Sequence, residues 1–134
     1  MKDDDGQKRI NTITEQIIGA AMEVHRILGP GLLESIYEAC LVLELGRMSI
    51  KVDRQVPVPI IYKGELAGQP LRMDLIIEND VIVEVKAVEK LIPIHQAQLM
   101  TYLKLTQCSV GLLINFNSVL IKDGIKRMVL NFDR

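Results

Sequence analysis

The stretch that decides the fold is RMDLIIENDVIVEVK, residues 72–86. Two β-branched, apolar runs flank a polar turn, which predicts a β-hairpin. Three ionisable residues lie within these runs in the pattern D-x(9)-E-x-K, although strand interiors disfavour acids and lysines: Asp74, Glu84 and Lys86. Because side chains alternate along a strand, Glu84 and Lys86 face the same way. The pattern therefore places a carboxylate and an ammonium on one face of a central strand.

The length of the hairpin turn decides whether Asp74 and Glu84 can act together. With a two-residue turn, Asp74 would oppose Val85, and the two carboxylates would point to opposite faces. With a three-residue turn, Asp74 opposes Glu84 or Lys86, and all three ionisable side chains share one face. The Asn and Asp of the turn tolerate the left-handed backbone that such turns use. A functional site therefore predicts a three-residue turn or a bulge.

The residue types on this face suit a metal-dependent reaction on a phosphate. Asp74 and Glu84 offer hard oxygen ligands for Mg²⁺, with Mn²⁺ as an alternative, and the Val85 carbonyl is a further candidate ligand. Lys86 would orient or deprotonate an attacking water, or neutralise charge on a phosphoryl oxygen. The alternative is a cross-strand salt bridge on a solvated face, because many strands would match this spacing.

The remaining chain predicts three helices and three more strands around this hairpin. Apolar residues recur with helical spacing over 14–28, and Gly-Pro-Gly at 29–31 ends that helix. The other expected elements are a helix over 32–47, an edge strand over 50–62, a helix over 93–105, and strands over 110–115 and 125–130. In the second helix the inward residues are expected to be Ile36, Ala39, Cys40 and Leu43. The order α-α-β-β-β-α-β-β predicts an α/β (α+β) fold with helices packed on a mixed sheet.

Two helices carry further polar residues at spacings that put them on one face. Glu34 and Tyr37 are three residues apart, and Gln98 and Tyr102 are four apart. Glu34 would be a third acidic ligand, direct or through water. Without the hairpin, each pair would be read as an ordinary exposed or core-flanking pair.

Composition narrows the class of protein. At 134 residues, 49% hydrophobic and 25% charged, the chain predicts one globular domain over 13–134 behind a flexible tail at 1–12. No apolar run is long enough to span a membrane, and the charged N-terminus is not a signal peptide. Two distant cysteines indicate reduced thiols and a cytoplasmic location.

The charge balance bears on the partner. A net charge of −1 argues against a general basic nucleic-acid binder. However, residues 1–83 hold 9 basic and 13 acidic residues, whereas residues 84–134 hold 7 basic and 4 acidic ones. The basic half begins at the proposed site, which weakly favours a polyanionic substrate there.

The segment EVHRILGPGLLESIY, residues 23–37, resembles the signature of the GxxExxY proteins, which are placed in the PD-(D/E)XK nuclease superfamily. Residues 72–74, 83–87, 96–102 and 111–116 are similar to the later motifs of that family. The resemblance spans roughly residues 14–132. One departure is Met73, which stands where the superfamily often has proline before the aspartate.

The resemblance implies a restriction-endonuclease-like αβββαβ core with an extra N-terminal helix. It implies Asp74 and Glu84 as Mg²⁺ ligands, Lys86 as the catalytic lysine, and Glu34 as an acid from the preceding helix. Gln98 and Tyr102 correspond to the QxxxY element of exonuclease-type members.

Three functions remain open from the sequence. The first is a Mg²⁺-dependent nuclease acting on nucleic acid, DNA rather than RNA, with phosphate contacts expected from Lys90, Lys104, Lys122, Lys126 and Arg127. The second is a catalytically weak nucleic-acid-binding or regulatory module with the same fold. The third, compatible with either, is a homodimer joined through the edge strand at 51–62.

Overall fold

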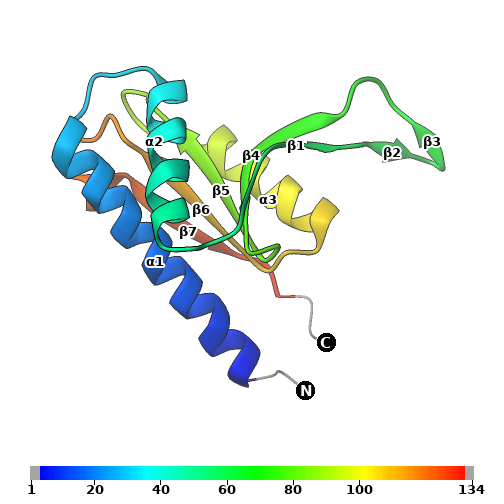
Figure 1. The fold of residues 1–134 in the computed structure, drawn as a ribbon. Coiled ribbons are helices and arrows are strands. Elements are labelled where there is room, and N and C mark those ends of the chain that lie inside the picture. Colours follow the sequence, from blue (N-terminus) through cyan, green and yellow to red (C-terminus); the bar gives the residue numbers. More distant parts are fainter. Residues whose placement is uncertain (1–3, 132–134) are drawn as a thin grey trace.

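The structure is a computed structural model that describes residues 4–131. Its elements follow one another along the chain (Figure 1): α1 (Asp4–Leu28), α2 (Glu34–Arg47), β1 (Val52–Val58), β2 (Ile61–Tyr62), β3 (Glu65–Leu66), β4 (Leu71–Ile77), β5 (Val81–Lys86), α3 (Pro93–Thr106), β6 (Val110–Asn115), the 3₁₀ helix η1 (Ile121–Gly124) and β7 (Ile125–Val129). None of the helices among these residues is long and apolar enough to cross a membrane.

The main sheet has five strands in the order β1-β4-β5-β6-β7. Its neighbours are antiparallel, except for β5 and β6, which run parallel and are joined by α3. A parallel pair needs such a crossover, because its strands cannot be closed by a tight turn. α1 and α2 cover one face of the sheet, and α3 covers the other (Figure 1). The predicted mixed α+β fold is confirmed.

Two apolar clusters hold these layers together, one on each face of the sheet. Val81, Val83 and Val85 of β5 pack in the cluster with α1 and α2, whereas Ile82 packs in the cluster with α3. Side-chain alternation therefore turns Glu84 and Lys86, like Ile82, toward the α3 face. β6 is buried at every residue because both of its faces are covered.

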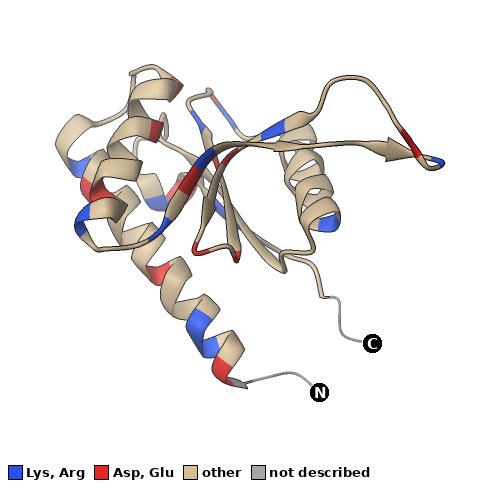
Figure 2. Cartoon of the chain, turned by 45° about the vertical axis from the view of Figure 1, so that its right-hand side comes forward, with Lys and Arg blue, Asp and Glu red and all other residues tan. Residues whose placement is uncertain are grey.

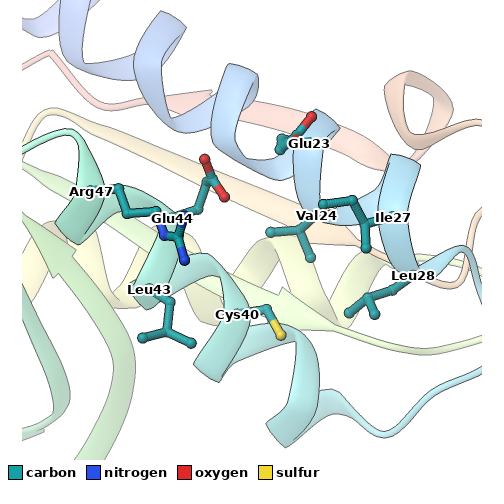
Figure 3. Close-up of a pocket in the computed structure, with 8 residues that line it drawn as sticks. All are labelled: Glu23, Val24, Ile27, Leu28, Cys40, Leu43, Glu44 and Arg47. Atoms are coloured by element: carbon teal, nitrogen blue, oxygen red, sulfur yellow. The ribbon is translucent and has the colours of Figure 1, made fainter.

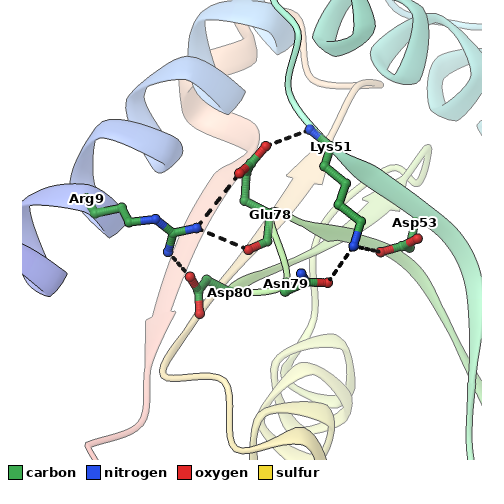
Figure 4. Close-up of polar contacts among 6 residues, drawn as sticks. All are labelled: Arg9, Lys51, Asp53, Glu78, Asn79 and Asp80. Atoms are coloured by element: carbon green, nitrogen blue, oxygen red, sulfur yellow. Dashed lines mark hydrogen bonds and ion pairs between the residues drawn. The ribbon is translucent and has the colours of Figure 1, made fainter.

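The N-terminal segment differs from the predicted flexible tail at 1–12. α1 begins at Asp4, so residues 4–12 extend the helix outward from the sheet, and residues 1–3 lie outside the described residues. Arg9 forms ion pairs with Glu78 and Asp80 of the β4–β5 turn (Figure 4). The first turns of the helix thus form ion pairs with a segment that is distant in the chain, and the local sequence does not reveal these pairs.

The inward face predicted for α2 was wrong in part. Ile36 and Leu43 are exposed, and the helix buries Tyr37, Leu41 and Leu45 instead. These three residues are each four apart and form one stripe toward the sheet. The predicted face differs from the buried face by about one residue, because aliphatic side chains occur on both faces of this helix.

The β4–β5 hairpin has the predicted three-residue turn, formed by Glu78, Asn79 and Asp80. The pairs Leu75–Val83, Ile76–Ile82 and Ile77–Val81 all share the register that this turn sets. Glu78 and Asn79 adopt left-handed backbone angles, with φ of 52° and 60°. Lys51 ties the start of β1 to the same turn, because its N–H donates to the Glu78 carboxylate and its ammonium to Asn79 (Figure 4).

β1 lies at the edge of the sheet, as its prolines predict. The second half of β1 and the first half of β4 form a two-stranded arm that ends in the β2–β3 hairpin (Figure 1). Toward the other end of the chain, β6 and β7 are joined by a connection that contains η1.

Candidate active site

Asp74 and Glu84 meet where β4 and β5 stop pairing through their backbones. The Asp74 N–H donates to Glu84 Oε2 at 2.9 Å, and the Val85 N–H donates to Asp74 Oδ2 at 2.8 Å. The two carboxylates thus occupy positions in the hydrogen-bond ladder that carbonyl groups would otherwise fill. Because the turn has three residues, Asp74 stands opposite Glu84, as predicted.

Each carboxylate keeps one oxygen that takes no backbone hydrogen bond. Asp74 Oδ1 has only the Gln55 amide near it, at 3.5 Å, and Glu84 Oε1 has no hydrogen-bond partner among the described residues. No side-chain oxygen within residues 4–131 is both fully buried and unpaired, so Glu84 Oε1 reaches solvent. Carboxylate oxygens that are left without a backbone partner are hard ligands of the kind that suits a divalent cation such as Mg²⁺ or Mn²⁺.

Ionisation of both carboxyl groups in this site is energetically unfavourable. Glu84 is only 3% exposed, and burial followed by the neighbouring Asp74 carboxylate raises its pKa to about 8. Burial also raises the pKa of Asp74, and the charges of Glu38 and Glu34 add to that rise. A cation bound between the two carboxylates would offset both causes.

Lys86 lies at the end of β5 on the same face as Glu84. Its charge lowers the pKa of both Asp74 and Glu84, although burial outweighs it at each carboxyl. In the part of the chain that the structure describes, the Lys86 ammonium has no hydrogen-bond or ion-pair partner. It therefore stands beside the carboxylates without being neutralised by contact, which suits a group that meets a phosphate or a water.

The structure also brings the predicted pair on α3 to this site. The Tyr102 hydroxyl donates to the Arg72 carbonyl of β4 at 3.2 Å, and the neighbouring Gln98 side chain lowers the pKa of this phenol. Burial, then the charges of Glu84 and Asp74, raise the pKa of the Tyr102 phenol. Tyr102 is 2% exposed, so it packs beneath the site, whereas Gln98 is exposed to solvent.

α2 supplies two acids, of which sequence reasoning chose one. Glu34, at the first turn, is exposed; it acts on Asp74 and Glu84 only through its charge. Glu38, one turn later, is 7% exposed and accepts hydrogen bonds from Arg54 and Gln55 of β1. The sequence analysis did not single out Glu38. The available signal was its place one residue from Tyr37, on the same buried side of the helix.

Tyr37 has a structural role in the loop before α2. Its hydroxyl donates to the Gly29 carbonyl at 2.6 Å and accepts the Leu32 N–H at 3.0 Å. Its ring stacks on Phe116, with ring centres 4.8 Å apart. The Gly31 N–H donates to Asn117, which fastens the same loop to the end of β6. The Gly-Pro-Gly segment therefore sets where α2, and with it Glu34, begins.

The basic residues predicted to meet phosphates do not all lie on the sheet face of Lys86. Figure 2 shows Lys and Arg scattered over helices and strands among acidic residues. Arg127 pairs with Leu112, whose side chain faces α1 and α2, and it donates to Asn11 of α1. It is thus on the opposite sheet face from Lys86, and its predicted role as a phosphate contact near the site was wrong.

A groove of about 300 Å³ lies between α1 and α2 (Figure 3). Apolar side chains, among them Val24, Ile27 and Leu43, line most of it, and charged residues stand at its rim. It contains none of the ionisable residues of the hairpin. The candidate active site at the β4–β5 gap is therefore separate from this groove.

The family model of the PD-(D/E)XK nuclease superfamily matches residues 11–128. The chain belongs to this superfamily. Its five-stranded mixed sheet with flanking helices is consistent with the restriction-endonuclease-like fold. No curated protein and no solved structure gave a significant match.

Members of this superfamily usually use divalent metal ions. Among residues 4–131, no group of three or more His, Cys, Asp or Glu side chains is arranged to hold a metal. A cation bound at the Asp74–Glu84 pair would therefore keep several coordination positions for water or substrate.

Proposed function

We propose that this protein is a Mg²⁺-dependent nuclease that hydrolyses phosphodiester bonds of nucleic acid. The observation that carries the proposal is the Asp74–Glu84 pair, with one open oxygen on each carboxylate, beside an uncontacted Lys86 ammonium. Mg²⁺ and Mn²⁺ prefer such oxygens, and membership of the superfamily supports a nucleic-acid substrate.

Asp74 and Glu84 would hold the cation, with the Val85 carbonyl as a third ligand. When bound, the cation would polarise the scissile phosphate. Lys86 would then hold or deprotonate the attacking water and neutralise charge that develops on a phosphoryl oxygen. Its position two residues from Glu84 on one strand face supports this role.

The helices would complete the site. Gln98, exposed on α3, would position water or the nucleic-acid strand, and Tyr102 would fix the β4 backbone beside Asp74. Glu34 would join through a water, since it acts on the carboxylates through its charge alone. Residues 13–134 would form the nuclease domain, and this domain would be one of the GxxExxY proteins.

DNA is the proposed substrate in preference to RNA. The scattered basic residues favour a short or single-stranded segment, because few phosphates are neutralised at once.

The two cysteines, Cys40 and Cys108, are unpaired, which supports a cytoplasmic location for the activity.

Calorimetric titration with Mn²⁺ tests the metal site. The wild type is expected to bind, and the Asp74→Asn/Glu84→Gln double variant is expected not to. Mg²⁺-dependent cleavage of a single-stranded oligonucleotide then tests the activity. Equal Mn²⁺ binding by both proteins would remove the two carboxylates from the proposal.

A second candidate is a nucleic-acid-binding or regulatory module with little catalysis. The observation that favours it is that no third acidic ligand joins Asp74 and Glu84 among residues 4–131, and that Glu84 has a pKa of about 8. Such a module would bind an oligonucleotide with the same affinity with and without Mg²⁺, and cleave none.

A homodimer through β1 is compatible with both candidates. β1 is the outer strand of the sheet, and most of its side chains are exposed. Two copies could pair their edges. Mass measured in solution over a range of concentrations tests this assembly.

A further inference from the structure

Gln55, in the middle of β1, has a backbone conformation that strands do not normally contain. Its φ is 49°, in the left-handed region that disfavours side chains other than glycine. Gln55 is exposed to solvent, so apolar burial does not compensate for this conformation. Its polar contacts are therefore the place to look for the reason.

The kink at Gln55 lies directly across from Asp74. The pairs Arg54–Leu75 and Val56–Met73 keep one register, which places Gln55 opposite Asp74 between them. At this point both strands change the face to which their side chains turn. In β4, Leu75 packs with the α1–α2 cluster, whereas Met73, two residues away, packs with the α3 cluster.

β1 changes face at the same place. Val52 packs with the α1–α2 cluster, and Val56, four residues on, packs with the α3 cluster. Regular alternation would put both on one face. The left-handed residue thus turns the β1–β4 ribbon just where the acidic pair lies.

The kink also aims the Gln55 amide between two carboxylates. Its Nε2 lies 3.0 Å and 3.2 Å from the two oxygens of Glu38, and 3.5 Å from Asp74 Oδ1. Glu38 is almost fully buried and is also bound by Arg54, so its own position is fixed. The buried carboxylate thereby decides that the NH₂ end of the amide, and not its carbonyl, faces Asp74.

We infer that Gln55, held by Glu38, is a positioning residue for Asp74. Asp74 Oδ2 is fixed by the Val85 N–H, and the Gln55 amide limits where Oδ1 can point. Hydrogen-bond partners that orient a metal-binding carboxylate typically contribute 10–100-fold to metal affinity. This inference rests on the proposed function, because it assumes that Asp74 binds a cation.

The test compares Mn²⁺ affinity and melting temperature for Gln55→Gly and Gln107→Gly. Gln107 ends α3 with a φ of 61° and an exposed side chain, so its substitution makes the same chemical change in the same backbone region away from the site. We expect Gln55→Gly to bind Mn²⁺ about tenfold or more weakly. Gln107→Gly should bind like the wild type, and both variants should keep a melting temperature near that of the wild type, since glycine relieves the left-handed strain.

Further variants make the result decisive. Gln55→Asn tolerates the left-handed conformation but is one methylene too short to reach both carboxylates, and it should show the same loss if Gln55→Gly fails to fold. Glu38→Gln should weaken Mn²⁺ binding as well. The Glu38→Gln/Gln55→Gly double variant should bind Mn²⁺ no more weakly than the single variant that has the lower affinity.

Three results would overturn the inference. Wild-type affinity in Gln55→Gly or Gln55→Asn, with binding abolished by Asp74→Asn, would refute the role of Gln55 and leave the proposed function standing. Absence of Mn²⁺ binding by the wild type would refute the proposed metal site and this inference together. A lower melting temperature with an unchanged affinity would show that Gln55 is only structural.

Discussion

Asp74 and Glu84 face each other across the gap between β4 and β5, and each accepts a backbone N–H from the opposite strand. This exchange holds both carboxylates in place without a cation. It also brings two like charges together in a site where one of them is almost fully buried. Such a pair is relieved either by a proton or by a metal ion, and the two compete for the same oxygens.

Metal affinity should therefore rise with pH. With a pKa of about 8, Glu84 is protonated at pH 6, and the cation must displace that proton. We expect Mn²⁺ affinity to rise by roughly tenfold per pH unit between pH 6 and pH 8 and then to level off. Calorimetry at pH 7 in buffers of different ionisation enthalpy should detect about one released proton per Mn²⁺. An affinity independent of pH would place the metal elsewhere.

Glu84→Gln should stabilise the metal-free protein in alkaline solution. The folded-state pKa of Glu84 lies above the value of 4.5 for an unperturbed glutamate, so the folded protein retains a proton that the unfolded chain releases. The free energy of unfolding consequently falls as pH rises from about 4.5 to about 8. Glutamine removes this dependence and should raise the free energy of unfolding at pH 8.5 by several kcal/mol, up to roughly 5, since each tenfold change in proton affinity corresponds to about 1.4 kcal/mol.

Urea unfolding at pH 5 and pH 8.5 measures the effect of Glu84→Gln. Glu65→Gln, at an exposed position on β3, is the matched control and should change neither value. If Glu84→Gln were less stable than the wild type at pH 8.5, the Glu84 carboxylate would be ionised without cost, and the raised pKa would be wrong.

The hairpin and its site could be predicted because their determinants are local. The alternation of residues 72–86 and the demand that Asp74 and Glu84 share a face together required a three-residue turn, which the structure has. A spacing of four on a helix predicts one face for Gln98 and Tyr102, and the Tyr102 hydroxyl donates to the Arg72 carbonyl of β4. The roles of both residues stay predictions.

The contributions of Glu38 and Gln55 could not be predicted, because they depend on contacts between distant segments. Gln55 reads as an ordinary polar residue of an edge strand, and only the packing of α2 against β1 places Glu38 above it. The same holds for Arg9, whose partners Glu78 and Asp80 lie about seventy residues away, and for the extension of α1 over the predicted tail.

Lys86→Ala should abolish Mg²⁺-dependent cleavage and leave the fold intact. The Lys86 ammonium has no hydrogen-bond or ion-pair partner within residues 4–131, so its removal breaks no polar contact there. Loss of a group that acts on water or on the phosphoryl oxygen typically costs 10²–10⁴-fold in rate. Lys8→Ala, at an exposed position on α1, is the control and should cleave at the wild-type rate. Cleavage by purified Lys86→Ala at the wild-type rate would refute the assignment of the lysine.

Arg9→Ala should destabilise the protein only slightly. The Arg9 side chain is half exposed, and its partners Glu78 and Asp80 are also accessible to solvent (Figure 4). Such surface ion pairs contribute about 0.2–1 kcal/mol and weaken with salt. The sequence alone predicts that removal of residues 1–9 leaves melting unchanged, whereas the structure predicts a small decrease that disappears in 1 M NaCl. A large decrease that persists in salt would indicate that the first turns of α1 pack against the sheet.

Tyr37→Phe should lower stability without affecting the metal site. The phenylalanine keeps the stacking on Phe116 but loses the hydrogen bonds to Gly29 and Leu32. Because Tyr37 is buried and both hydrogen bonds are partly buried, we expect a loss of about 1–2 kcal/mol in the free energy of unfolding. Tyr62→Phe, on the exposed β2 strand, removes a hydroxyl from a tyrosine that is 65% exposed and should cost nothing measurable. A drop in Mn²⁺ affinity for Tyr37→Phe at unchanged stability would mean that Tyr37 acts on the carboxylates, and not on the loop that starts α2.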